Sequence, residues 1–444
     1  PFRSPDSMRW VITASSDLPT SEDKVLITGM GTVGMLQVRE GTTAEWAPAE
    51  AVGALDTDLG LNDAGQYVFA TNTDGPSDAD EYIILGDIVN DTFTVVDQQG
   101  QDVPGFKGIE AYGSTLNSPS LTNDGRSSFK ADFTQGDLSG EEDAFVIFDD
   151  ASFAQIGVDA PTGQANDPAE TWDNFDTGDI QVSADGLTLM VQGDTNADTS
   201  FDDVLTINNN VVIQEASVLL GSDFTSPVDL ISESTLMTNG DWFARGDNED
   251  EQDWVVRNGQ VLVATGDPIV DGADELFSDA IFGSTFFWMA GNDNGDYVIG
   301  GTTDNPDDFA DAVLTLNGEF VVARQGDVVT VPGAGPTDIM ARIDIFNNDD
   351  GFLTNDRMLY FTASLVDMDG NDLGQAFLRK DLSGLGQDEC PGDTDNSGNV
   401  DVSDLLNVLA AFGETGDLPA DVTGDGVVDI QDLLLVLAAF GDCP

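Results

Sequence analysis

One phrase recurs along most of this chain: an Asn/Asp-Gly turn followed by a run of β-branched and aromatic residues. The turn at Gly65 precedes Tyr67–Ala70, and the turn at Gly125 precedes Ser128–Ala131. Counting Met8 and Arg357, which stand in the glycine position at the two ends, the phrase occurs seven times at intervals of 54 to 62 residues: Met8, Gly65, Gly125, Gly186, Gly240, Gly295 and Arg357. A repeat of this period constrains the fold more than any other feature, because each unit buries its apolar surface against the next.

Each repeat contains four short apolar runs separated by turns. The second run is represented by Val313–Leu316, the third by Val261–Val263 and the fourth by Phe286–Met289. Asn258-Gly259 is a typical two-residue hairpin turn, and runs of four or five such residues between turns are typical of strands. We therefore predict that residues 1–384 form an all-β, seven-bladed β-propeller with four-stranded blades. A β-sandwich array or a β-solenoid is the alternative.

The two ends of the repeat array are incomplete. The first repeat lacks the strand before its turn at Met8, and the last, which ends at Leu378–Lys380, lacks its third strand. Either residues 1–8 close the ring, or a strand edge is left open for another chain, because an unpaired edge is a pairing site.

After a linker at 385–389, residues 390–444 carry two twelve-residue loops, offset by 28 residues, with calcium-ligand spacing. Oxygen ligands at loop positions 1, 3, 5, 9 and 12, a main-chain carbonyl at position 7 and glycine at position 6 can wrap one Ca²⁺. The first loop offers Asp393, Asp395, Ser397, the Asn399 carbonyl, Asp401 and Asp404; the second offers Asp421, Thr423, Asp425, the Val427 carbonyl, Asp429 and Asp432. We expect two bound Ca²⁺ ions, the second held less tightly because Thr423 is a neutral ligand.

Each loop leads into a predicted helix, Asp404–Gly413 and Asp432–Gly441, rich in Leu and Ala. This duplicated loop–helix unit resembles a type I dockerin, a module that binds a receptor module called cohesin. The resemblance implies calcium-dependent binding of a protein partner, a cohesin-like module or a neighbouring subunit, through the helix faces and through Val402, Ser403, Ile430 and Gln431. These four positions depart from the Ser/Thr pair common in cellulosomal dockerins.

Two cysteines, Cys390 and Cys443, bracket this C-terminal unit. Their placement predicts a disulfide bond and an oxidising compartment. The preceding residues 8–380 resemble bacterial secreted proteins built from tandem Asn-x-x-Gly propeller repeats. That resemblance implies a propeller fold, no particular activity, and a location outside the cell or on the surface of a bacterium.

The composition excludes several classes of function. The chain has 444 residues with 14 Lys and Arg against 83 Asp and Glu, a formal charge of −69, so nucleic acids and anionic membranes would be repelled. Histidine is absent, which excludes every mechanism that needs an imidazole. No apolar run approaches the ~18 residues that span a membrane.

Acidic segments follow the first run of most repeats, which predicts one acidic face of the ring. The clearest segment contains Asp194, Asn196, Asp198 and Asp202. It resembles the calcium-binding hairpin loop of integrin-type propellers, which implies a further Ca²⁺ site there. A solvated, solubilising surface is the alternative.

These features predict a secreted or cell-surface, calcium-dependent structural or interaction protein. Its dockerin would attach it to a partner or to the next copy, and attachment to the next copy would build a homo-oligomer or an extracellular filament. No catalytic motif is present, so we predict no enzymatic activity. The alternative is a dockerin-anchored, carbohydrate-active propeller enzyme.

Overall fold

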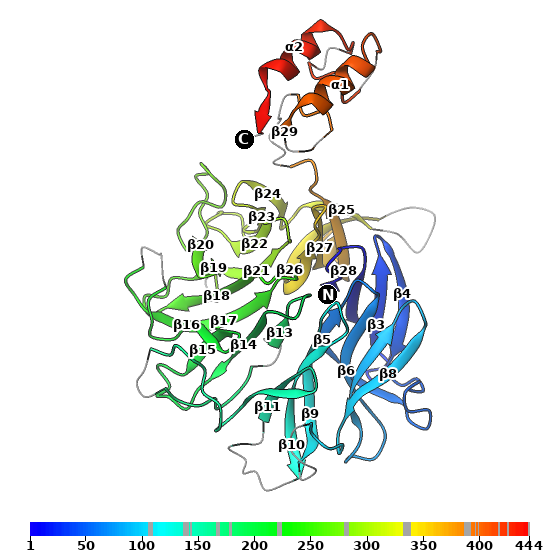
Figure 1. Cartoon of the computed structure of the whole chain (residues 1–444), viewed down its shortest axis with the longest axis vertical. Coiled ribbons are helices and arrows are strands. Elements are labelled where there is room, and N and C mark those ends of the chain that lie inside the picture. The colour runs from blue at the N-terminus through cyan, green and yellow to red at the C-terminus, as the bar shows by residue number, and fades with distance from the viewer. Residues whose placement is uncertain are drawn as a thin grey trace. The chain divides into compact units, whose positions relative to one another are not determined.

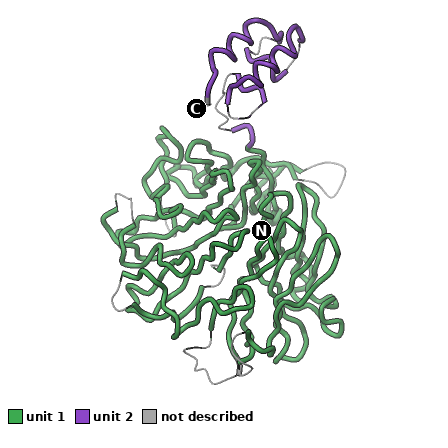
Figure 2. The backbone as a smooth tube through the Cα atoms, in the orientation of Figure 1, with its two compact units in different colours: residues 1–382 green, residues 383–444 purple. Residues whose placement is uncertain are grey.

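The computed structural model describes residues 1–104, 110–135, 142, 144–165, 169–176, 180–219, 224–278, 284–331, 339–385, 392–395, 397, 399–415, 418–423 and 426–442. The chain divides into two compact units, Pro1–Leu382 and Ser383–Pro444, which are coloured separately in Figure 2. Among the described residues, no helix is long and apolar enough to cross a membrane.

Unit 1 consists of seven antiparallel sheets of four strands each, which we number as blades 1 to 7 in chain order (Figure 1). Blade 1 contains β1 (Phe2–Arg3), β2 (Trp10–Ser15), β3 (Lys24–Met30) and β4 (Val33–Arg39). Blade 2 contains β5 (Val52–Leu61), β6 (Gln66–Thr73), β7 (Glu81–Asp87) and β8 (Thr92–Gln98). Blade 3 contains β9 (Ala111–Leu121), β10 (Ser127–Gln135), β11 (Ala144–Phe148) and β12 (Ala151–Gln155). Blade 4 contains β13 (Ile180–Val182), β14 (Leu189–Asp194), β15 (Asp203–Ile207) and β16 (Asn210–Gln214). Blade 5 contains β17 (Val228–Leu236), β18 (Trp242–Asn248), β19 (Trp254–Arg257) and β20 (Gln260–Ala264). Blade 6 contains β21 (Phe286–Gly291), β22 (Tyr297–Thr302), β23 (Ala312–Leu316) and β24 (Phe320–Arg324). Blade 7 contains β25 (Val328–Val331), β26 (Ile339–Leu353), β27 (Met358–Asp367) and β28 (Asp372–Asp381).

This architecture confirms the predicted seven-bladed β-propeller with four-stranded blades. The apolar core lies between neighbouring blades, where, for example, Val11 and Leu26 of blade 1 pack in one cluster with Tyr67 and Phe69 of blade 2. The two faces of each blade are covered by the neighbouring blades. This explains why strands such as Leu189–Asp194 are buried on both faces along nearly their whole length.

The recurring Asn/Asp-Gly turns, which join the first and second strands of the blades, are hydrogen-bonded to one another around the whole ring. We call these bonds the turn belt. From blade 1 back to blade 1 they are Asp6 N–H to Asp63 Oδ1 (2.6 Å), Asp63 N–H to Asn123 Oδ1 (3.0 Å), Asn123 N–H to Ala184 O (2.7 Å), Ala184 N–H to Thr238 O (3.0 Å), Thr238 Oγ1–H to Asp293 Oδ1 (2.5 Å), Asp293 N–H to Asn355 Oδ1 (3.0 Å) and Asn355 N–H to Ser7 Oγ (3.0 Å). The repeated turn is therefore a contact between blades as well as a chain reversal.

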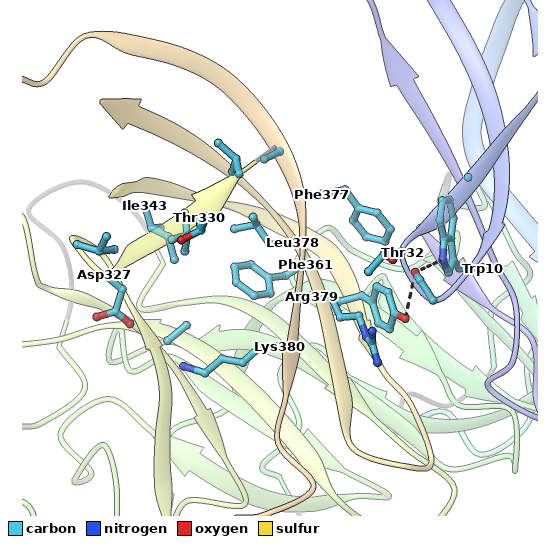
Figure 3. Close-up of a pocket in the computed structure, with 18 residues that line it drawn as sticks. Trp10, Thr32, Asp327, Thr330, Ile343, Phe361, Phe377, Leu378, Arg379 and Lys380 are labelled. Atoms are coloured by element: carbon cyan, nitrogen blue, oxygen red, sulfur yellow. Dashed lines mark hydrogen bonds between the residues drawn. The ribbon is translucent and has the colours of Figure 1, made fainter. Parts of the chain in front are cut away.

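Blades 7 and 1 meet at a seam where side chains close the ring. Trp10 of blade 1 packs edge-on against Phe377 of blade 7, with ring centroids 5.3 Å apart, in a cluster that includes Phe352 and Tyr360. The indole N–H of Trp10 and the hydroxyl of Tyr360 both donate to the Gly31 carbonyl, at 3.0 and 3.3 Å (Figure 3). No strand is shared between the two blades among the described residues.

The ends of the repeat array differ in part from the expectation. The strand thought to be missing from the first repeat exists, because Phe2 and Arg3 form β1 and pair with Val11 and Trp10. The two-residue length of β1 explains why no apolar run announced it. In the last repeat, the missing third run, which forms the fourth and outer strand of the other blades, is indeed absent from the described residues, because β28 stands in the third-strand position and pairs only with β27. The sheet reaches four strands because β25 pairs with the start of β26.

The acidic segments lie on the ring face opposite the turn belt, because they join the second and third strands of antiparallel blades. This placement holds for the segments that follow β6, β14, β18, β22 and β27. The acidic segment Asp137–Asp143 lies outside the described residues apart from Glu142. The expected acidic face is therefore present in the parts of those blades that the structure describes.

Unit 2 contains β29 (Asn399–Val400), α1 (Val402–Ala410), α2 (Ile430–Ala438) and β30 (Gly441–Asp442). The strand β29, which lies within the first twelve-residue loop, pairs with β30, so that loop is joined to the segment that follows α2. Val400, Val408, Val428 and Val436 form its small buried core. Both helices begin two residues before the predicted positions, because Asp401 and Asp429 are their N-caps.

The turn belt yields a test at the seam. Replacement of Asn355 by Ala removes its bond across the seam to the Pro5 carbonyl (3.2 Å) as well as its two bonds to Asp293 of blade 6 (2.8 and 3.0 Å). We expect a loss of roughly 2 kcal/mol in the free energy of unfolding. The matched control is Asn123→Ala, which removes the equivalent 2.6 Å bond to Asp63 between two blades that the chain also connects covalently. Denaturant unfolding should show the larger loss for Asn355→Ala, and an equal or smaller loss would contradict this account of ring closure.

A second test concerns Asp97, which is buried between blades 2 and 3. Burial, reinforced by the nearby Asp150 carboxylate, raises its pKa to about 7 against a hydrogen bond from Tyr112 that lowers it. Between pH 3.8 and about pH 7, the Asp97 carboxyl is protonated in the folded protein and ionised in the unfolded chain. Each rise in pH across that interval therefore lowers the free energy of unfolding, and the loss is complete above it. Asp97→Asn should therefore raise Tm by about 2 °C or more at pH 8 and hardly change it at pH 4. Calorimetry at the two pH values measures the difference, and an equal shift at both would contradict the assignment.

Candidate metal centre

The first twelve-residue loop of unit 2 brings carboxylates together at one point. Asp393, Asp395 and Asp404 each place a carboxylate oxygen within 4.8 Å of the others, and this is the only group of three or more such ligands among the described residues. Asp404 is fully buried, whereas Asp395 is exposed. Three oxygens at this separation provide the hard, anionic donors that Ca²⁺ prefers.

Main-chain N–H groups hold the buried carboxylate in position. Asp404 Oδ1 accepts from the N–H of Thr394 at 2.7 Å, and its Oδ2 accepts from the N–H of Asp401 at 2.8 Å. Burial acts to raise the pKa of Asp404, but these hydrogen bonds outweigh it and hold the pKa below its usual value. The carboxylate is therefore kept ionised, the form that a cation requires.

The loop and the helix share residues. Asp401, a predicted ligand, is also the N-cap of α1, where it accepts from the N–H of Ser403 at 2.6 Å. Asp404 returns the capping bond to Asp401, which is a capping box. Ser397 donates its hydroxyl to the Asn399 carbonyl at 3.1 Å, so these two predicted ligands are adjacent. Movement of the loop must therefore change the start of the helix.

The second loop repeats this arrangement. Asp432 is fully buried and accepts from the N–H groups of Thr423 (2.9 Å) and Asp429 (2.7 Å). Asp429 caps α2, and Asp421 Oδ2 accepts from the N–H of Gly426 at 2.7 Å. The Thr423 hydroxyl donates to Asp432 at 2.9 Å. Val427 lies in this loop, whereas the predicted ligand Asp425 lies outside the described residues.

The acidic propeller loop is arranged differently. The Asn196 amide donates to the Thr171 hydroxyl at 2.9 Å, and Asp198 accepts from the Ser200 hydroxyl at 3.2 Å. Burial, reinforced by Asp202 and Asp173, raises the pKa of Asp194. In the described residues, Asp194, Asp198 and Asp202 do not converge as the carboxylates of the first loop do. Calcium binding by this loop stays a prediction.

The residues predicted to contact a partner are accessible. Val402 and Ile430 are 60% and 54% exposed, and the neighbouring Ser403 and Gln431 are also exposed. The helix faces, which were also expected to contact a partner, continue this surface as an exposed apolar stripe whose residues the sequence analysis did not name, and the stripe runs just past each helix end: Leu406, Leu409 and Phe412 on the first half, and Leu434, Leu437 and Phe440 on the second. The i, i+4, i+7 spacing, repeated at an offset of 28, was the available signal. Cys390 and Cys443 lie outside the described residues, so their disulfide also stays a prediction.

The chain was compared with known proteins. No protein-family model matches it, and no curated protein is similar to it in sequence. Among solved structures it is similar to TolB from Acinetobacter baumannii (TM-score 0.37, 13% identity, covering 72% of this chain and 63% of that one) and to the Dos1 propeller (0.37, 10%, 80% and 75%). It is also similar to puromycin hydrolase (0.41, 12%, 84% and 52%).

The loops of unit 2 make a direct prediction. If they bind Ca²⁺, residues 392–442 should exchange amide hydrogens slowly with Ca²⁺ and quickly in chelator, because without the cation the clustered carboxylates repel one another. Hydrogen-exchange mass spectrometry of the full chain should show the propeller strands unchanged. Asp395→Asn should weaken the effect, and Glu414→Gln, an exposed acid of the same unit outside the cluster, should not. Equal exchange in both conditions would contradict the metal assignment.

Proposed function

We propose that this chain is an extracellular, calcium-dependent attachment protein of a bacterium. Unit 2 binds a protein partner once Ca²⁺ has ordered its two loops, and the propeller is the rigid body that this unit anchors. The support is specific to unit 2: a convergent carboxylate cluster lies at the base of a helix whose apolar side chains face solvent. Secretion agrees with the predicted calcium loops, since extracellular Ca²⁺ is abundant enough to fill sites of modest affinity.

The paired apolar stripes carry the proposal. In a unit of this size, four large apolar side chains exposed on each half are more than solubility favours, and exposed apolar patches mark interaction sites. The 28-residue offset makes the two stripes copies of one another, so either half offers a similar surface. The first turns of α1 and α2 connect these stripes to the calcium loops, because Val402 and Ile430 directly follow the capping ligands.

The partner is a cohesin-like receptor module or a neighbouring copy of this chain. A contact between unit 2 of one molecule and another molecule of the same kind is heterologous, so it propagates into a filament unless the ring of contacts closes. Sedimentation velocity with and without Ca²⁺ separates these two partners. Calcium-dependent growth of the purified chain supports the filament, and a persistent monomer assigns the partner to another protein.

The function is tested by calcium-dependent capture. Immobilised full-length protein should retain its partner from the culture fluid or envelope fraction of the source cells in Ca²⁺ and release it in chelator. Leu406→Asp or Leu434→Asp alone should weaken capture, and the double variant should abolish it, because the halves are duplicated. The control is Leu187→Asp, an equally apolar residue that is 75% exposed on the propeller. Capture that is indifferent to Ca²⁺, or to the double variant, would overturn the proposal.

A further inference from the structure

The outer edge of blade 7 differs from the edge of every other blade. In blades 1 to 6 a fourth strand covers the third strand, but β28 stands in the third-strand position and has a strand on one side only among the described residues. Third strands elsewhere are largely buried, as in Ala312–Leu316, whereas no described residue of β28 is buried. After Asp381 the chain continues into unit 2 instead of turning back along the sheet.

A groove of about 780 Å³ surrounds this free edge. Successive side chains of β28 line it from opposite faces of the sheet: Phe377 and Arg379 lie on the side of Trp10, and Leu378 and Lys380 on the side of β25 (Figure 3). A groove that reaches both faces of an edge strand leaves room for a strand beside it. The main-chain groups of residues 372–380 have no other strand to pair with in the described part of the chain.

We propose that this groove is a strand-addition site, which binds an extended segment of a separate polypeptide as the missing fourth strand of blade 7. Added strands gain affinity from main-chain hydrogen bonds and specificity from alternate side chains. The six fourth strands of the other blades show which sequences suit the position, with β-branched runs such as Gln260–Ala264 and Asn210–Gln214. The inference is independent of the function proposed for unit 2.

The charge of the edge defines the segment further. Arg379 and Lys380 are exposed, and neither forms an ion pair among the described residues, whereas six other arginines in this acidic chain do. Arg379 also lies over the ring of Tyr360, 5.8 Å from its centroid, on the wall of the groove. A bound segment with an acidic residue opposite Arg379 would neutralise this local positive charge. The occupant is therefore an extended segment of β-branched residues with an acid at one end.

A second copy of this chain is a poor source of that segment. Every described strand is already paired within its own sheet, so a donor copy would have to open one of its blades. The segment is therefore assigned to a different protein.

The test uses a labelled peptide with the sequence of residues 258–267, in which Gln260→Glu supplies the acid. In blade 5, Gln260 pairs with Arg257, and Arg257 pairs with Phe243, which lies three residues after the turn residue Gly240. In blade 7, Arg379 pairs with Tyr360, which lies three residues after the turn residue Arg357. The two arginines are thus equivalent. Fluorescence anisotropy should show saturable binding of the peptide to the full chain in chelator, a condition in which we expect unit 2 not to bind a partner. Val261→Pro/Val263→Pro in the peptide should abolish it, because both residues are paired with the neighbouring strand in blade 5 and proline removes a main-chain donor from each.

The variant Arg379→Glu/Lys380→Glu should weaken binding of this peptide at least tenfold and should favour a peptide with Gln260→Lys. The control Lys24→Glu, an exposed base of blade 1 outside the groove, should leave affinity unchanged within twofold. Both protein variants must melt at the wild-type temperature, so that lost binding is not lost folding. Absence of binding, or equal binding of the proline peptide, would mean that the charged residues merely protect the edge. Self-association in chelator that the double variant removes would identify the occupant as a second copy and overturn the assignment.

Discussion

One interaction recurs in both units of this molecule: a side-chain oxygen accepts main-chain N–H groups at a tight turn. Along the turn belt, Asp63, Asn123 and Asn355 accept N–H groups from a neighbouring blade. In unit 2, Asp404 and Asp432 accept N–H groups from within their loops. Such bonds satisfy main-chain donors that would otherwise be left unpaired in tight turns. In an acidic chain they also give carboxylates a favourable environment, which spreads part of the negative charge over main-chain dipoles.

The two units use this interaction to different ends. In the propeller it joins rigid blades, so the ring closes at the seam without a shared strand, with help from the aromatic cluster around Trp10. In unit 2 it orients carboxylates toward one another, which is unfavourable until a cation arrives. The proposed function would therefore combine a propeller that is stable by itself with a unit that attaches to a partner only when Ca²⁺ is bound.

Much of the propeller could be predicted from sequence, because each blade repeats the same turns between its strands. The interval between turns fixed the number of blades, and hairpin signals such as Asn258-Gly259 located the strands. The ends were harder. Two residues, Phe2 and Arg3, are too few to show an apolar run, yet they pair as a strand because blade 1 offers an inner edge. The pairing of β25 with the start of β26 was not predicted either, because it adds a strand at the opposite edge of blade 7 from β28, where the repeat pattern places none.

The carboxylate cluster of the first loop in unit 2 could be located from residue spacing alone, since ligand positions are fixed along the sequence, and calcium binding by both loops stays a prediction. The geometry that links them to the helices could not, because it depends on Asp401 and Asp429 acting as caps. The acidic propeller loop shows the limit of spacing arguments. Its carboxylates follow a calcium-like pattern, but Asn196 is bonded to Thr171, a residue from a distant part of the sequence.

The most direct measurement is the number of Ca²⁺ ions bound per chain, determined by equilibrium dialysis with radioactive calcium. The account predicts two bound ions in the wild type, the second held less tightly than the first, one in Asp404→Asn or Asp432→Asn, and none in the double variant, while the propeller keeps its unfolding temperature. A wild-type chain that binds no calcium, or a double variant that retains both ions, would contradict the calcium-dependent attachment described here.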